Sequence, residues 1–502
     1  MTEMTNLESD AFVFFGATGD LAYRQIFPAL QALIRRGDFE IPIIGVAKSA
    51  MDLDALRARA HKSLEEHGGV DPRAFATLSP HLQYMNGDYR DPETFRQLRT
   101  ALGGSCRPLY YFAIPPELFA TVAEGLAGSD SHHGARVVVE KPFGRDLASA
   151  QALNRTLHKS FPESAIFRID HYLGKEPVQN LVYFRFANSF LEPIWNHQYI
   201  ESVQVTMAET VGVEGRGRFY EEVGTIRDVV QNHLLEVVAL LTMEAPVGDH
   251  PDALRDNKQR AFRAMRPLAT TDVVRGQFRG YRNEDGVAAG SHVETFAAIR
   301  LSIDTPRWAG VPFYIRAGKR LPLTATEVRV EFKRPPQTVF DTASARNADY
   351  IRFRLSPNVT ISLGARVKLP GEAMVGEGVE LLVRHVAGDE MMPYERLLGD
   401  AVRGDATLFV REDAVEAAWR VVDPVLGNKT PVHEYEPNTW GPSEADQIVA
   451  NGSGWDNPEP VAPPARGGTA LNRDDALPRS KARSGQPYAD ETLASAESQV
   501  EP

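Results

Sequence analysis

The first third of the chain alternates short strand-like segments with segments of helical periodicity, and this alternation restricts the fold more than any other feature. Between the strand-like segments, apolar residues recur at helical spacing, as at Ile26, Leu30 and Leu33. Strands rich in Val, Ile and Tyr that are separated by helices indicate a parallel sheet covered on both faces. The segments predicted as strands are 12–15, 41–46, 82–85, 108–114 and 135–140.

A glycine turn, "GATGDL" at 16–21, joins the first strand to the first helix. Glycines here would let the backbone turn sharply and approach a pyrophosphate, which the N-terminus of the next helix attracts. The spacing is looser than G-x-G-x-x-G, and glycine turns of this kind are common. Because no Gly-Lys-Ser/Thr follows, a nucleoside-triphosphate loop is disfavoured. The residues expected to contact a dinucleotide are Gly16, Thr18, Gly19, Asp20 and Leu21.

Lys48, in "VAKS", follows the second strand, where a dinucleotide-binding fold contacts the adenosine ribose. An acidic residue at this place typically binds the 2′-hydroxyl of NAD, whereas a basic residue favours the 2′-phosphate of NADP. Lys48 therefore predicts NADP. The alternative is a surface lysine at the start of a helix.

A cluster of ionisable side chains occupies the stretch "FRIDHYLGKEPVQN" at 167–180, directly after an apolar run. An ordinary turn needs Gly, Asn, Asp or Pro for backbone reasons and does not need long ionisable side chains of both signs. A single charge is usually solvated surface, but the cluster of Asp170, His171, Tyr172 and Lys175 predicts a ligand site. Lys141, in "EKPFG", follows the fifth strand and lies at the same ligand-binding edge.

Beyond about residue 190 the pattern changes to alternation of apolar and polar residues. Such strands bury one face and are typical of a large antiparallel sheet. The segment 222–243 is predicted to be one long helix on that face, with Asn232 and His233 interrupting its apolar stretch. A lone histidine on such a helix is usually a satisfied core residue. The predicted strands are 201–211, 292–303, 327–333, 350–356 and 359–366.

Composition limits the remaining possibilities. A chain of 502 residues, 43% hydrophobic and 24% charged, is too long for one core and predicts two domains. The net charge of −12 argues against a nucleic acid or an anionic membrane as partner. One cysteine, Cys106, and the lack of a secretory leader or a membrane-length apolar run predict a cytoplasmic protein. The segment 456–502, rich in Pro, Ala, Ser and charge, is expected to be a disordered tail.

Several motifs together resemble glucose-6-phosphate 1-dehydrogenases. They occur in the order of that family and at roughly its separations, over about residues 11–455: "GATGDL", "EKPFG", "RIDHYLGKE", "ETVGVEGRGRFYE", "RDVVQNHL" and "PFYIRAGKRL". The resemblance implies a Rossmann-type coenzyme domain at 1–175 and an α+β domain with a large antiparallel sheet at 176–455. It also implies a homodimer or homotetramer. The implied reaction is hydride transfer from C1 of β-D-glucose 6-phosphate to NADP, giving 6-phosphoglucono-1,5-lactone without a metal.

The resemblance also implies roles for individual residues. His233 matches the general base for the C1 hydroxyl, and Asp170 the carboxylate that orients it, which suits a group that titrates near neutral pH. The positions that match contacts to the sugar or its phosphate are Lys141, His171, Tyr172, Lys175, Glu209, Asp228 and Lys319. Tyr111 and Lys141 match cofactor contacts.

The sequence departs from the family pattern in three places, the third of which covers two residues. Tyr23 replaces a common lysine after "GDLA", and Lys48 replaces an arginine, which loses the two-pronged grip on phosphate. Thr324 and Ala325 stand where relatives carry a further basic residue. Alternatives are therefore NAD preference, another hexose phosphate, or a sugar-phosphate-binding regulator with little turnover. The intact pair of Asp170 and His233 favours an active dehydrogenase.

Overall fold

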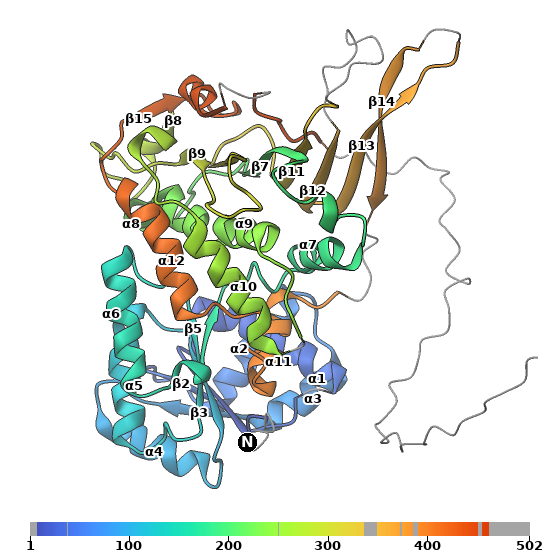
Figure 1. The fold of residues 1–502 in the computed structure, drawn as a ribbon. Helices are drawn as coiled ribbons and strands as arrows, with labels where there is room; N and C mark the ends of the chain where they lie inside the picture. The colour runs from blue at the N-terminus through green and yellow to red at the C-terminus, as the bar shows by residue number, and fades with distance from the viewer. Residues whose placement is uncertain are drawn as a thin grey trace, which may run out of the picture. The chain divides into compact units, whose positions relative to one another are not determined.

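The computed structural model describes residues 8–37, 39–248, 250–335, 349–371, 374–384, 390–449 and 454–460. Two sheets organise this chain, and Figure 1 shows the first in blue to teal and the second in green to orange. None of the helices in the described ranges is long and apolar enough to cross a membrane.

The first sheet confirms the predicted parallel α/β domain. It has six parallel strands in the order β3-β2-β1-β4-β5-β6, so the strand order reverses between β1 and β4. This is the doubly wound Rossmann arrangement, in which ligands bind outside the carboxyl ends of the strands. The strands are β1 (Ala11–Phe15), β2 (Ile43–Ala47), β3 (Leu82–Asn86), β4 (Pro108–Phe112), β5 (Arg136–Glu140) and β6 (Ile166–Ile169).

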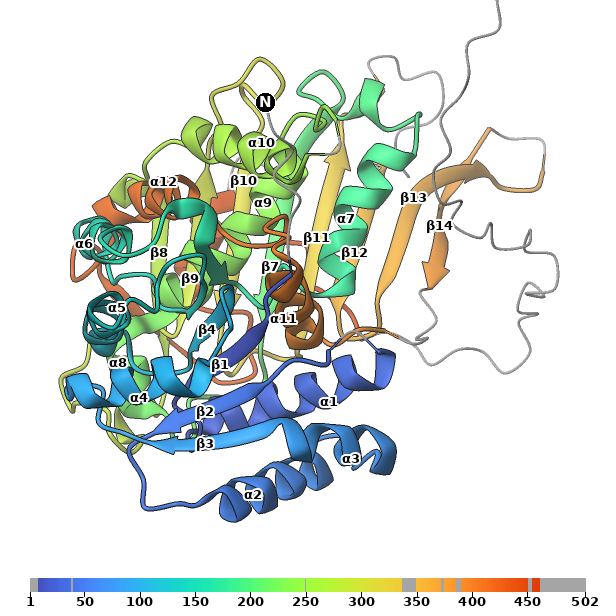
Figure 2. The same ribbon diagram turned by 90° about the horizontal axis from the view of Figure 1, so that it is seen from below.

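Helices cover both faces of this sheet because its strands are apolar on both sides. Phe12 and Phe14 of β1 pack on one face, and Val13 and Phe15 on the other, all fully buried. Figure 2 shows the two groups of helices on opposite sides of the strands. The first group is α1 (Phe27–Arg36), α2 (Leu53–Glu66) and α3 (Pro72–His81); the second is α4 (Pro92–Leu102), α5 (Phe119–Gly128) and α6 (Leu147–His158).

The second sheet has nine strands in the order β14-β13-β12-β11-β7-β10-β9-β8-β15. Most neighbours are antiparallel, as predicted, but β7 with β10 and β8 with β15 are parallel, so the sheet is mixed. The strands are β7 (Ile200–Ala208), β8 (Val273–Phe278), β9 (Phe296–Leu301), β10 (Phe313–Gly318), β11 (Ala325–Phe332), β12 (Tyr350–Ser356), β13 (Thr360–Lys368), β14 (Gly376–Arg384) and β15 (Val432–Tyr435).

The expectation that this sheet buries only one face is wrong for its central strands. Polar residues of β7, including Gln204, are buried as well, because the segment that ends the described chain lies over them. The carboxamide of Gln204 bonds the Gly454 carbonyl at 2.9 Å, and Arg354 bonds the Glu459 carbonyl at 2.6 Å. These contacts run past residue 456, where the tail was expected to begin. Residues 461–502 lie outside the described ranges.

The predicted long helix at 222–243 is also wrong as a single element. It consists of α8 (Gly217–Thr225), the π-helix η5 (Ile226–Leu234) and α9 (Leu235–Thr242). Gly224, with φ 63°, interrupts the helical backbone inside α8, one residue before its end, and a Cβ there would lie 2.6 Å from a carboxylate oxygen of Glu294. The π-helical segment carries His233.

Later segments return to the first sheet. Helices α7 (Glu176–Ala187), α10 (Pro251–Ala264) and α12 (Glu412–Val422) belong to the second half, but α11 (Pro393–Arg403) packs on α1. The ring of Phe409 lies 4.8 Å from that of Phe167 in β6, and Val410 pairs with Arg168. Residues distant in sequence therefore reach the edge of the first sheet where the predicted site residues lie.

Candidate active site

The predicted catalytic pair forms where β5 and β6 end. Asp170 directly follows β6, and η5 brings His233 from the second half of the chain against it, with His233 Nδ1 2.6 Å from Asp170 Oδ1. Both residues are buried: His233 is 5% exposed and Asp170 is 1% exposed. Lys141, directly after β5, places its Nζ 2.8 Å from the other ring nitrogen of His233, Nε2. The imidazole therefore has a carboxylate on one side and an ammonium group on the other.

Backbone contacts fix both members of the pair. The Asp170 carboxylate also accepts the Tyr172 backbone N–H at 2.9 Å. Asn232, the other polar residue in the apolar helix, accepts the His233 N–H at 2.6 Å and donates to the Arg227 carbonyl. Asn232 thus satisfies backbone groups inside the π-helical segment, where i to i−4 bonding is interrupted.

Burial and neighbouring charge keep His233 neutral and Asp170 ionised. Burial lowers the pKa of His233; the Asp170 charge opposes this shift and Lys141 reinforces it. Burial alone would raise the pKa of Asp170, but the charge and hydrogen bond of His233, with Lys141, hold it well below its usual range. A neutral imidazole that donates through Nδ1 to a carboxylate has a lone pair at Nε2, which is the state a general base needs.

The residues expected to bind phosphate surround this pair. The Tyr172 ring lies 4.7 Å from the His233 ring, and Lys175 Nζ lies 4.1 Å from the centre of the Tyr172 ring. The His171 ring lies 4.8 Å from His233. Burial, together with the nearby His233, lowers the pKa of His171 to about 3, so His171 is neutral near pH 7. Of His171, Tyr172 and Lys175, the cation near pH 7 is therefore Lys175.

Two residues of this site were missed by the sequence reasoning. Tyr394, on α11, stacks its ring parallel to His171 at 6.4 Å and hydrogen-bonds Glu140. Glu140 also accepts the Tyr111 hydroxyl at 2.5 Å, and burial raises the pKa of Glu140 to about 7. Glu140 lies in the "EKPFG" motif, so its position was a usable signal. Nothing local marks Tyr394, because only tertiary packing brings α11 here.

The other predicted sugar-side residues lie in the same region. Lys319 forms an ion pair with Glu209, and Lys141 Nζ lies 3.5 Å from the Asp228 backbone carbonyl. The negative charge of Glu209 partly offsets the lowering of the Lys175 pKa by burial, and the charge of Asp228 does the same for the pKa of His233.

Thr324, which directly precedes β11, and Ala325, which begins it, stand where the family pattern has a further basic residue. The Thr324 hydroxyl accepts the Thr210 backbone N–H at 3.1 Å, and Ala325 is buried. The next residue, Thr326, hydrogen-bonds the Tyr172 hydroxyl, so these positions border the phosphate-side residues.

The glycine turn lies between β1 and the helical segment that begins with η1 (Ala22–Ile26). Gly16 has φ 87°, and a Cβ there would lie 2.1 Å from the Ala113 carbonyl oxygen, so glycine is required for the chain to pass the end of β4. The Gly19 N–H closes the turn on the Gly16 carbonyl at 2.9 Å. Thr18 and Leu21 are partly exposed and Asp20 is exposed.

Residues outside the turn complete this edge. Tyr89, which was not predicted, accepts the Gly16 N–H and donates to the Val46 carbonyl. Lys48 is exposed at the end of β2 and pairs with Asp88 at 2.7 Å. Tyr23 packs its ring 4.7 Å from the Arg59 guanidinium. A helix N-terminus behind a glycine turn, at the carboxyl end of a parallel sheet, fits a nicotinamide dinucleotide.

Tyr111 differs from the other predicted cofactor residues. Its side chain is 1% exposed, and its hydroxyl is bonded to Glu140 inside the protein.

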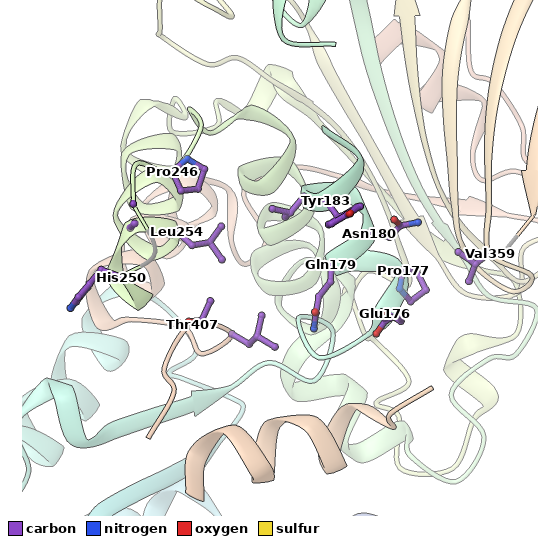
Figure 3. A pocket seen from close by; sticks show the side chains of 14 residues that line it. Glu176, Pro177, Gln179, Asn180, Tyr183, Pro246, His250, Leu254, Val359 and Thr407 are labelled. Carbon is purple, nitrogen blue, oxygen red and sulfur yellow. The ribbon is translucent and has the colours of Figure 1, made fainter. Parts of the chain in front are cut away.

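A separate cavity of about 640 Å³ lies between α7 and α10, as Figure 3 shows. Its wall includes Glu176, Tyr183 and Leu254, and none of the predicted site residues lines it. This cavity is therefore distinct from the cluster of residues around His233.

The fold and the site together define a class, the two-domain nicotinamide-dependent dehydrogenases, in which a Rossmann-type domain meets a second domain that supplies a buried histidine. Comparisons with known proteins narrow this class. Residues 13–180 match the model "Glucose-6-phosphate dehydrogenase, NAD binding domain", and residues 182–456 match "Glucose-6-phosphate dehydrogenase, C-terminal domain".

Relatives agree with these matches. Glucose-6-phosphate 1-dehydrogenase 1 of Mycobacterium tuberculosis is 43% identical over 453 residues, which is 90% of this chain and 97% of the relative. The crystal structure of glucose-6-phosphate 1-dehydrogenase from Mycobacterium avium superposes with a TM-score of 0.85 at 43% identity, covering 91% of this chain and all of that chain (100%). A glucose-6-phosphate dehydrogenase in complex with glucose-6-phosphate gives a TM-score of 0.83 at 34% identity, covering 90% and 100%. The chain belongs to the glucose-6-phosphate dehydrogenase family.

Proposed function

We propose that this protein is an NADP-dependent glucose-6-phosphate dehydrogenase that oxidises β-D-glucose 6-phosphate at C1 to 6-phospho-D-glucono-1,5-lactone. Family membership over most of the chain supports the reaction class. The observation that carries the proposal is the buried contact of His233 with Asp170 beside Lys141. A protein that only binds sugar phosphate has no need of a neutral, oriented imidazole.

In the proposed mechanism, His233 Nε2 accepts the proton of the C1 hydroxyl. Asp170 receives the Nδ1–H bond, fixes the tautomer and stabilises the imidazolium that forms. When bound, the nicotinamide ring supplies the acceptor for the hydride from C1. Proton removal raises electron density on the oxygen, which makes departure of the hydride easier.

Lys141 has to change partners during this cycle. In the structure its ammonium group lies 2.8 Å from His233 Nε2, the atom that must receive the substrate proton. The C1 hydroxyl therefore takes the place of the Lys141 contact when substrate binds. Lys141 would then lie beside the sugar and the coenzyme, which suits the role expected from its position after β5.

The phosphate of the substrate would be bound by Lys175, His171 and Tyr172. Lys175 supplies charge, and the neutral His171 supplies a ring N–H. Glu209, Asp228 and Lys319 would contact the sugar. The turn residues and Lys48 would bind the coenzyme, with NADP preferred through the 2′-phosphate. We further propose a cytoplasmic homodimer or homotetramer that requires no metal.

The absorbance of reduced nicotinamide tests this proposal when the protein is mixed with glucose 6-phosphate and NADP. We expect turnover that persists in EDTA and that exceeds turnover with other hexose phosphates. Repeating the assay with NAD measures coenzyme preference. Saturable binding of glucose 6-phosphate without turnover would instead support the regulator, and loss of activity in EDTA would contradict the metal-free mechanism.

A further inference from the structure

Two opposite charges meet where the coenzyme ribose is expected. β2 and β3 are parallel neighbours whose last residues, Ala47 and Asn86, stand in register. The chain leaving β2 presents Lys48, and the chain leaving β3 presents Asp88. Lys48 Nζ and Asp88 Oδ2 lie 2.7 Å apart. The sequence shows only the lysine at this place, because Asp88 is contributed by the neighbouring strand.

Asp88 is the better fixed of the two side chains. Its other oxygen, Oδ1, accepts the Arg90 backbone N–H at 3.0 Å, and its carbonyl accepts the Thr94 hydroxyl at 2.8 Å. The hydrogen bond from Lys48 lowers the pKa of Asp88, which therefore stays ionised. The Lys48 side chain is 74% exposed, against 38% for Asp88, so Lys48 can turn to another anion while Asp88 stays.

The two groups favour different coenzymes. A basic residue at this place attracts a 2′-phosphate, and a carboxylate accepts a hydrogen bond from a ribose 2′-hydroxyl. A carboxylate also repels a 2′-phosphate and competes with it for the lysine. The net preference therefore depends on both residues.

We propose that Asp88 is a coenzyme-specificity residue, which accepts the ribose 2′-hydroxyl of NAD and weakens the preference for NADP by opposing its 2′-phosphate and holding Lys48. This inference rests on the proposed function, because it assumes a nicotinamide coenzyme at this sheet edge. It adds that the protein binds both coenzymes and that one carboxylate sets the ratio.

Fluorescence titration of the intact protein with NADPH and NADH tests this inference without turnover. Asp88→Asn removes the charge but keeps an oxygen for the Arg90 N–H, so the turn is preserved. We expect NADPH to bind about tenfold more tightly to this variant, roughly the effect of one charge-assisted contact. NADH should bind to this variant as tightly as it binds to the wild type, or more weakly. Lys48→Ala should lower the affinity for NADPH about tenfold and leave the affinity for NADH nearly unchanged.

The double variant separates the two effects of Asp88. If Asp88 acts partly by holding Lys48, then Asp88→Asn must gain less NADPH affinity in the Lys48→Ala background than in the wild type. Asp54→Asn is the matched control, since it removes one exposed carboxylate from the coenzyme domain at the start of α2. It should leave both affinities unchanged.

Three other results of these titrations would contradict either the role of Asp88 or the proposed function. An Asp88→Asn protein with an unchanged NADPH-to-NADH ratio, or a shift toward NADH, overturns the inference while leaving the proposed function intact. An equal gain in the two backgrounds also overturns the claim that Asp88 holds Lys48. Failure of the wild type to bind either reduced coenzyme would instead remove the proposed function itself.

Discussion

Replacing His233 by asparagine tests the base directly. The imidazole is buried, and its Nδ1 lies 2.6 Å from Asp170 Oδ1. Asparagine is smaller but carries an N–H₂ group that can donate to Asp170, so the buried carboxylate keeps a partner. We therefore expect His233→Asn to fold and to bind both ligands, but to lack an acceptor for the C1 proton.

The size of the effect follows from the kind of catalysis. General-base catalysis contributes typically ~10²–10⁴-fold, which is about 2.7–5.4 kcal/mol at about 1.36 kcal/mol for each factor of ten. We expect kcat to fall by at least that factor, with modest changes in KM. A purely structural histidine would show the opposite pattern, with a lowered Tm and a nearly normal kcat for the folded fraction.

The pH profile supplies a second measurement. Because the pKa of His233 is lowered from its ordinary value of about 6.5, the neutral base persists to lower pH than it does for a free imidazole. kcat/KM should therefore stay constant to below about pH 6.5 and decline only as the pH falls through this lowered pKa. This acid limb should disappear in His233→Asn, where no imidazole remains to be protonated.

His171→Asn provides the matched control. His171 is an imidazole whose ring lies 4.8 Å from that of His233, but it is assigned to phosphate binding. Its replacement should raise KM for glucose 6-phosphate more than it lowers kcat. Near-normal turnover of folded His233→Asn would refute the reasoning, return His233 to the role of a core histidine, and move the search for the base to Asp228 or Glu209.

Three further variants test neighbouring parts of the site. Lys175→Ala should raise KM for glucose 6-phosphate at least tenfold and change turnover of free glucose little; equal losses for both substrates would remove Lys175 from the phosphate site. Asp170→Asn should lower kcat by no more than His233→Asn does, because the base itself remains. A larger loss of kcat in Asp170→Asn, measured in the same assay, would contradict the assignment of His233 as the base. Gly16→Ala should lower the affinity for NADPH at least tenfold in a fluorescence titration, because the added Cβ would lie 2.1 Å from the Ala113 carbonyl oxygen. Gly37→Ala is the control: Gly37 also has a positive φ, 81°, but a Cβ there has nothing within 4 Å, so the affinity for NADPH should not change.

The sequence was most informative where structure is set by local pattern. Nearly continuous apolar strands such as 12–15 identify the parallel sheet, because every side chain is buried between helices. The alternating strands identify the second sheet, but not the parallel pairing of β7 with β10. Alternation also could not reveal that Gln204 is buried, because its cover comes from Gly454 and neighbouring residues far along the chain.

The site shows the same limit. Asp170 and His171 were visible because they sit in one dense polar cluster. His233 was noticeable because it interrupts an apolar helix, but its proposed role came only from the family resemblance. Asp88 and Tyr394 were not, since each looks like an ordinary surface or helix residue until β3 and α11 bring it to the sheet edge. The break at Gly224 was missed because helical periodicity continues across it, although a side chain there would collide with Glu294.

The position of Lys141 connects the coenzyme half of the proposed site with the substrate half. One residue after β5, it belongs to the coenzyme domain, yet its ammonium group contacts His233, which comes from the other half of the chain. A cation at Nε2 disfavours protonation of the imidazole, so the base is kept neutral before substrate arrives. In the proposed mechanism, the C1 hydroxyl would replace Lys141 at Nε2, so that the base gains a proton donor and the ammonium group moves toward the sugar. The exchange that places the substrate would therefore also remove from Nε2 the cation that opposes formation of the imidazolium.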